Sequence, residues 1–181
     1  MLLAGESLAH VVVGRPDEAQ LDAYLASLET IDISTLARQE QMAYYINAYN
    51  AWTIKLILTA WPDLKSIKDL GNLFQSPWKK AFVRLKDRVV TLDYIEHDIL
   101  RPRYKDPRIH FAINCASISC PPLLDVPYVG AELDRQLDTV TTNFINDSGS
   151  NHFKDSALHV SKIFKWFNED FNGDVFGFFK R

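Results

Sequence analysis

The sequence predicts an α+β fold in which helices surround a long central helix and pack on a small, mostly antiparallel sheet. Two kinds of pattern support this class: an apolar helical pattern from about Thr35 to Trp61, and two pairs of short apolar runs with hairpin spacing. With 181 residues, of which 47% are hydrophobic and 24% charged, the chain has the composition of one domain with a full core. We therefore expect residues 1–181 to form a single domain.

The first two helices are predicted from their end signals and apolar spacing. Asp17 is placed to cap a helix whose apolar residues recur at helical intervals, namely Leu21, Tyr24, Leu25 and Leu28. The second helix, from about Thr35 to Trp61, is apolar on nearly every side, and Pro62 ends it because proline has no N–H to donate. This second helix is predicted to be the buried centre of the domain.

The middle of the chain predicts a hairpin, a short helix and a strand. Residues 82–85 and 88–91 flank Lys86-Asp87 in the pattern of a tight turn, and Thr91 can cap a helix that ends just before Pro102. The segment Arg108 to Asn114 then alternates, with Ile109, Phe111 and Ile113 on one face of a predicted strand and His110, Ala112 and Asn114 on the other. Such a strand would present its polar face to a site.

The last third predicts a loop, a helix, a hairpin and a final helix. Cys115 to Gly130 contains three prolines and is predicted to be a restrained loop. An amphipathic helix follows, with its apolar side formed by Leu133, Leu137, Val140 and Phe144. A small hairpin is expected to turn at Asp155-Ser156, and Ser161 is placed to cap an aromatic-rich helix.

The composition argues against several classes of function. Twenty basic against 23 acidic residues give a net charge of −3, so the chain lacks the basic field that attracts nucleic acid. No apolar run reaches the ~18 to 20 residues of a membrane-spanning helix, and the first residues lack the basic segment of a signal peptide. The aromatic residues around Trp52 and Trp166 have the spacing of a core, so no cofactor is predicted. The expected partner is a small molecule or a peptide.

Three motifs occur in an order that is typical of a known family. They lie at Tyr44–Ala51, Tyr94–Arg101 and Asp106–Pro121, with Ser161–Phe164 adding to the likeness. Together they resemble the family called domain of unknown function 547, from roughly Leu21 to Phe179. The resemblance assigns no reaction. Its bacterial members resemble exported or envelope proteins, which implies an envelope or periplasmic location and suggests an enzyme, whereas plant members are C-terminal parts of larger coiled-coil proteins, which suggests a partner-binding module.

The N-terminal part departs from the family pattern. The family usually has a longer passage with a Val-Asp-Tyr-like segment, where this chain has only Val13–Glu18. A missing strand or helix there is expected to reduce stability or to open one side of the site.

Four residues are candidates for thiol chemistry. Cys115 follows the predicted strand directly, and a thiol near an imidazole titrates low and becomes a nucleophile. His110 is the expected base. Five residues of strand would place it roughly 16 Å from Cys115, which is too far for a direct contact. Cys120 serves better as its partner if the loop returns Cys120 toward His110. Glu96 would orient the imidazole. The alternatives are a structural thiol or a disulfide between the two cysteines, and an ion pair of Glu96 with Arg101 or Arg108.

A second set of polar residues is expected to bind ligand or to support the site: Asn47, Asn50, His97, Arg101, Arg108 and Asn114. Asn47 and Asn50 share one face of the central helix, where buried amides need partners, so we expect them mainly to hold loop backbone. His97, His110 and the two cysteines have suitable chemistry for a metal, but His-x4-Cys-x4-Cys is not a recurrent zinc spacing and no metal is predicted.

These residues favour a cysteine-dependent hydrolase or acyl transferase. The rival interpretation is a non-catalytic binding domain in which the same residues form a hydrogen-bonded, disulfide-closed core, and a redox role for the two thiols is the third. A papain-like order built on His159 with Asn168 or Asp170 ranks below the site at His110, because His159 lies outside the family motifs.

Overall fold

A computed structural model describes residues 17–72, 75–117 and 119–180. The passage Val13–Glu18, where a shortening is expected, falls largely outside these residues. The helical elements, in chain order, are α2 (Glu18–Thr30), η1 (Ile33–Thr35), α3 (Arg38–Leu58), η2 (Ile67–Leu70), η3 (Pro77–Lys79), α4 (Leu92–Tyr94), η4 (Ile95–Leu100), α5 (Arg101–Tyr104), α6 (Ile109–Ala112), η5 (Gly130–Glu132), α7 (Leu133–Asn146), α8 (Lys162–Trp166), η6 (Asn168–Phe171) and α9 (Val175–Phe179). The strands are β1 (Val83–Leu85), β2 (Arg88–Val90), β3 (His152–Lys154) and β4 (Ala157–His159).

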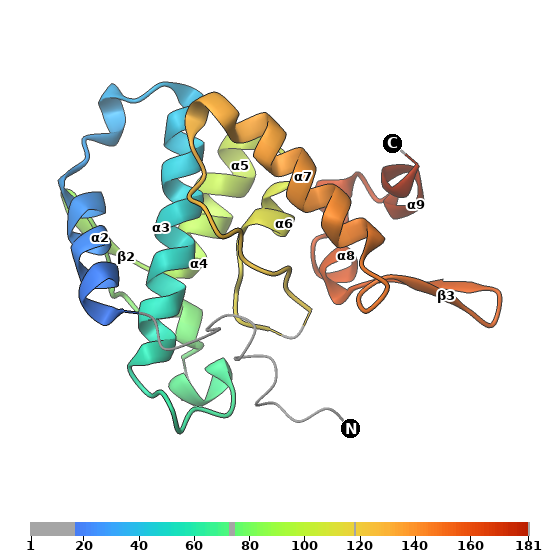
Figure 1. Cartoon of the computed structure of the whole chain (residues 1–181), viewed down its shortest axis with the longest axis horizontal. Helices are drawn as coiled ribbons and strands as arrows, with labels where there is room; N and C mark the ends of the chain where they lie inside the picture. Colours follow the sequence, from blue (N-terminus) through green and yellow to red (C-terminus); the bar gives the residue numbers. More distant parts are fainter. Residues whose placement is uncertain (1–16, 73–74, 118, 181) are drawn as a thin grey trace.

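Helix α3 runs through the middle of the molecule, as the apolar pattern predicts (Figure 1). Helix α2 lies on one side of it, and α4 to α6 lie on the other. Helix α7 packs on α6, and α8, η6 and α9 follow at the far end. The α+β class with a long central helix is confirmed, and the strands form two separate antiparallel hairpins, β1–β2 and β3–β4. None of the helices in the described ranges is long and apolar enough to cross a membrane.

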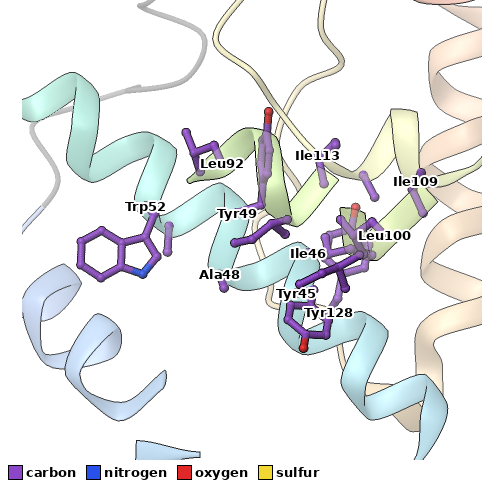
Figure 2. Close-up of a cluster of buried hydrophobic side chains, with 14 of the residues drawn as sticks. Tyr45, Ile46, Ala48, Tyr49, Trp52, Leu92, Leu100, Ile109, Ile113 and Tyr128 are labelled. Carbon is purple, nitrogen blue, oxygen red and sulfur yellow. The ribbon is translucent and has the colours of Figure 1, made fainter. Parts of the chain in front are cut away.

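The core is built around α3 (Figure 2). Ile46, Ala48 and Tyr49 are completely buried. They face buried residues contributed by four later segments, including Leu92, Leu100, Ile109, Ile113 and Tyr128. Burial of such side chains is worth roughly 1.5–3 kcal/mol each. The helix can therefore hold segments that are far apart in the sequence in fixed positions.

The predicted end signals are present. The Asp17 carboxylate accepts hydrogen bonds from the backbone N–H groups of the first turn of α2, Thr91 does the same for α4, and Ser161 for α8. Both hairpins form where expected. The second one turns at Asp155 and Ser156, whose φ angles of 51° and 62° give the left-handed backbone of a two-residue turn.

Two expectations for the middle of the chain are wrong. The helix that begins at Leu92 does not end before Pro102. It passes through a π-helical turn, η4, and continues to Tyr104. Proline in a helix lacks an N–H and crowds the carbonyl one turn earlier, and a wider π turn directly before it accommodates this.

The predicted strand at Arg108–Asn114 is instead the short helix α6, followed by an extended residue, Ile113. The alternation of apolar and polar residues carries no information here, because all residues from Ile109 to Asn114 are buried, the polar ones included. With both predicted faces buried, a period of two cannot distinguish a strand from a helix. The estimate of roughly 16 Å between His110 and Cys115 assumed an extended strand, so it does not apply to this helix.

Candidate functional site

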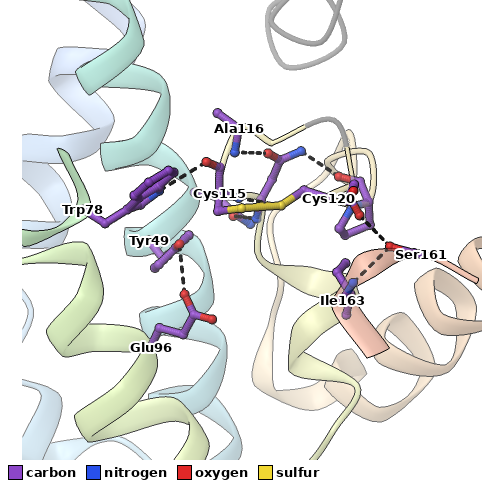
Figure 3. The surroundings of a disulfide bond; sticks show 12 residues. Tyr49, Trp78, Glu96, Cys115, Ala116, Cys120, Ser161 and Ile163 are labelled. Atoms are coloured by element: carbon purple, nitrogen blue, oxygen red, sulfur yellow. Dashed lines mark hydrogen bonds between the residues drawn. A yellow bond between two sulfur atoms is a disulfide. The ribbon is translucent and has the colours of Figure 1, made fainter. Parts of the chain in front are cut away.

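A cleft with a volume of about 730 Å³ is lined by residues of α3, η2, η3, η4, α6 and α8 and of the loop that contains the two cysteines. Its wall contains all four residues predicted for thiol chemistry, namely Glu96, His110, Cys115 and Cys120. His97 also lines it, whereas the other residues predicted to bind ligand lie outside its lining. In Figure 3, Tyr49 and Glu96 lie on one side and Ser161 and Ile163 on the other, with the two cysteines between them.

Helix α6 places the His110 imidazole at the wall of the cleft. The ring stacks on Phe167, with the ring centroids 3.9 Å apart and the planes 17° from parallel. Its Nε2 lies 2.6 Å from Oδ2 of Asp170. The carboxylate partner of this histidine is therefore Asp170, and not Glu96 as expected. In the described part of the chain, Nδ1 of His110 is buried and has no hydrogen-bond partner.

The surroundings set the protonation of this pair. Burial lowers the pKa of His110 to about 4, although the hydrogen bond that His110 donates to Asp170 opposes this shift. Burial raises the pKa of Asp170, but hydrogen bonds from Arg101 and His110 outweigh it and hold that pKa below its usual value. At neutral pH the imidazole is thus uncharged and the carboxylate ionised. A carboxylate can only accept, so Nε2 carries the proton and Nδ1 presents a lone pair.

The two cysteines form a disulfide that closes the short loop after α6. The Asn114 side chain braces this loop at both ends, since its Oδ1 accepts from the Ala116 N–H at 2.7 Å and its Nδ2 donates to the Pro121 carbonyl at 2.6 Å. Ala116 has a φ of 60°, a left-handed conformation that is unfavourable for a residue with a side chain. The backbone N–H of Cys115 donates to Sγ of Cys120 at 3.3 Å. The described residues contain no free thiol in this state.

Two neighbouring side chains fix the loop against the walls of the cleft (Figure 3). The Trp78 indole donates to the Cys115 carbonyl at 3.2 Å, and the Ser161 hydroxyl donates to the Ser119 carbonyl at 3.0 Å. Ser161 thus caps α8 and at the same time ties this helix to the disulfide loop.

Glu96 lies in the π-helical turn and is almost fully buried. Its Oε2 accepts a hydrogen bond from the Tyr49 hydroxyl at 3.1 Å, and burial raises its pKa. It makes no ion pair with Arg101 or Arg108 among the described residues, contrary to the alternative considered for it. A carboxyl group held toward its neutral form in a cleft can donate as well as accept a hydrogen bond.

The arginines expected to bind ligand are bound to carboxylates. Arg101 pairs with Glu169 and with Asp170, and it also contacts the His97 ring at 2.8 Å. Arg108 pairs with Asp106 at 2.6 Å and with two acidic residues of α7, Asp134 and Asp138. Arg101 therefore positions the carboxylate that holds His110, and Arg108 ties α6 to α7.

The two asparagines of α3 hold backbone on both sides of the cleft loop. Asn50 donates to the Ala112 carbonyl at 2.9 Å and accepts from the Asn114 N–H at 2.9 Å. Asn47 makes the same two-point contact with the carbonyl and N–H of Tyr128. Both amides are used by the protein itself, as expected of amides in a core.

Stability is expected to fall as the pH drops from about 6.5 to about 4, because His110 is buried in its neutral form. The unfolded chain takes up a proton at this imidazole near its ordinary pKa of about 6.5, whereas the folded chain does so only near 4. The unfolded state binds more protons in this window, so unfolding becomes easier on acidification by on the order of 3 kcal/mol. Urea denaturation of the wild type and His110→Gln between pH 7 and pH 4 measures this difference. An identical pH dependence in both proteins would contradict it.

A comparison with known protein families matches residues 33–145, more than half of the chain, to the family described as protein of unknown function, DUF547. The chain belongs to the DUF547 family. No curated protein and no solved structure matches it significantly. The DUF547 match covers α3, the π-helical turn, α6 and the disulfide loop, but it ends within α7. Asp170 and the aromatic residues that pack on His110 lie outside the matched segment.

Sequence reasoning missed the role of three site residues: Phe167, Asp170 and Trp78. Asp170 was considered only as a partner of His159. The structure places His159 in β4, where its ring stacks on His152, away from the cleft lining. No local spacing signals the contact between His110 and Asp170, since sixty residues separate them.

Proposed function

We propose that this DUF547 protein is a thiol-dependent hydrolase or acyl transferase whose nucleophile is masked as a disulfide in the state described. One observation carries the proposal. The imidazole of His110 is neutral, is held by Asp170 through one nitrogen and has a second nitrogen with no partner among the described residues, and it lines the same cleft as Cys115 and Cys120. A carboxylate, an imidazole and a nucleophile are the parts of a general-base triad, and this cleft contains all three residue types.

The chemistry begins with reduction of the disulfide. A phosphine and a water molecule convert the Cys115–Cys120 bond to two thiols and leave the phosphine oxide. His110 Nδ1 then takes the proton of one thiol, and the thiolate attacks the acyl carbon. The tetrahedral species collapses to a thioester as the leaving group takes the proton from the imidazolium. Water or another acceptor releases the acyl group by the same steps in reverse.

Cys120 is the better candidate for the nucleophile. Its sulfur accepts a hydrogen bond from the Cys115 N–H at 3.3 Å, and a donor directed at a sulfur favours its thiolate form. The Cys115 sulfur has no such donor among the described residues.

The two single cysteine variants provide a matched test. Cys115→Ser and Cys120→Ser each abolish the disulfide, but only the second removes the proposed nucleophile. With p-nitrophenyl and thioester acyl donors, we expect the wild type to be active only after phosphine reduction. Cys115→Ser should be active without reductant, and Cys120→Ser inactive in both conditions. Equal activity of the two variants, or no turnover by the reduced wild type, would overturn the proposal.

A second candidate is a non-catalytic ligand-binding domain. The observation that favours it is the bracing of the disulfide loop, because Asn50, Asn114 and Ser161 hold its backbone in one shape. This candidate predicts that phosphine reduction reveals no acyl-transfer activity and that a ligand binds equally to the oxidised and reduced protein.

A further inference from the structure

The cleft carries two lysines on segments that are far apart in the chain. Lys68 lies in η2 and Lys162 is the first residue of α8. Both are exposed, and neither side-chain ammonium group makes an ion pair or hydrogen bond within the described ranges. Lys162 directly follows Ser161, which Figure 3 shows on the side opposite Tyr49 and Glu96. As far as the described residues go, the two ammonium groups are therefore available to a ligand.

Neither acidic residue of the cleft lining pairs with these lysines in the described part of the chain. Asp93 faces the His97 ring at 3.8 Å, and Glu96 is buried against Tyr49 with its pKa raised. The cleft thus contains two lysine ammonium groups that pair with neither of its carboxyl groups, although the chain as a whole carries −3. Ammonium groups without a carboxylate partner can attract and bind an anion.

The rest of the lining is largely apolar and aromatic. Trp78 and Phe167 are half-buried, and Trp166 is 48% exposed at the edge of the cleft. Ile67 and Ile113 are buried beneath the surface of the cleft. An apolar lining with a few charged groups is typical of a site for a small organic molecule.

We propose that the substrate of this site is an anionic acyl compound, in which an apolar segment separates the reacting carbonyl from a carboxylate that Lys68 and Lys162 bind. The inference rests on the proposed function, because it assigns the acyl carbon to the thiol and His110. The aromatic side chains contact the apolar segment, and the two lysines select the charged end. Neutral acyl compounds of the same length lose this selection.

Two esters of equal chain length test the selection. The reduced wild type is expected to hydrolyse p-nitrophenyl hydrogen glutarate roughly 3- to 10-fold faster, as kcat/KM, than p-nitrophenyl pentanoate. The double substitution Lys68→Glu and Lys162→Glu should reverse the preference. The control is Lys65→Glu with Lys165→Glu, which changes the same charges on nearby exposed residues outside the cleft lining and should keep the preference.

Direct binding of glutarate, measured by titration calorimetry, separates this inference from the proposed function. If neither ester is hydrolysed but the wild type binds glutarate and the cleft double variant does not, the anion site is supported and the thiol mechanism fails. If both esters are hydrolysed at equal rates and glutarate does not bind, the mechanism is supported and the anion site is overturned. Equal binding of glutarate by the cleft and control variants would also overturn the anion site.

Discussion

Replacing His110 with glutamine is expected to lower kcat/KM of the reduced protein by roughly 10²- to 10⁴-fold, because the substitution removes the proposed general base. Glutamine can keep a hydrogen bond to Asp170 and some of the packing on Phe167. Its amide cannot take a proton from a thiol at neutral pH. Initial rates on a thioester, measured alongside circular dichroism spectra, check the prediction on folded protein.

His159→Gln is the matched control. This histidine lies in β4, stacks on His152 and does not line the cleft. Its replacement should leave the rate within about a factor of two, as expected of an exposed residue. Loss of activity in His159→Gln with retention in His110→Gln would favour the papain-like order and would remove His110 from the mechanism.

Phe111→Ala is expected to reduce the free energy of unfolding by about 3–5 kcal/mol. Phe111 is completely buried in α6, and its ring contacts an aromatic cluster formed by Phe144, Phe164, Phe171 and Phe178. Truncation leaves a cavity between α6, α7 and the C-terminal helices, and it removes the aromatic contacts as well. Urea denaturation at neutral pH measures the loss.

Phe153→Ala is the control for this prediction. Phe153 is 76% exposed in the β3–β4 hairpin, so the same truncation there should change stability by no more than about 0.5 kcal/mol. Similar losses in the two variants would mean that the aromatic cluster does not stabilise the C-terminal part of the fold.

Local signals in the sequence predicted the elements whose structure is decided locally. The cap residues Asp17, Thr91 and Ser161 act within one helical turn, and the hairpin at Asp155-Ser156 depends on two turn residues. The central helix was predicted because apolar residues on all its sides require burial. The observed ends of this helix, Arg38 and Leu58, each differ by only a few residues from the predicted ones.

The site was predicted in part, and the missing part depends on tertiary packing. Four of the predicted residues, Cys115, Cys120, His110 and Glu96, do line one cleft. The sequence could not show that α6 is a helix, since burial of all its residues hides its period, nor that Asp170 returns to His110 from the end of the chain. That contact exists because Phe167 and Phe171 pack on the His110 ring and bring the carboxylate between them into reach.

The braces around the disulfide loop have a consequence for how the protein responds to its surroundings. Asn50 and Asn114 hold the loop through contacts that do not involve sulfur, so its course is fixed independently of the bond between Cys115 and Cys120. A disulfide that closes so short a loop lowers the conformational entropy of the unfolded chain only modestly, so it stabilises the fold by about 2 kcal/mol. We therefore expect the disulfide to be reduced and formed again while the protein stays folded. Under the proposed mechanism, the redox conditions around the protein would then set the fraction of molecules that carry the two thiols.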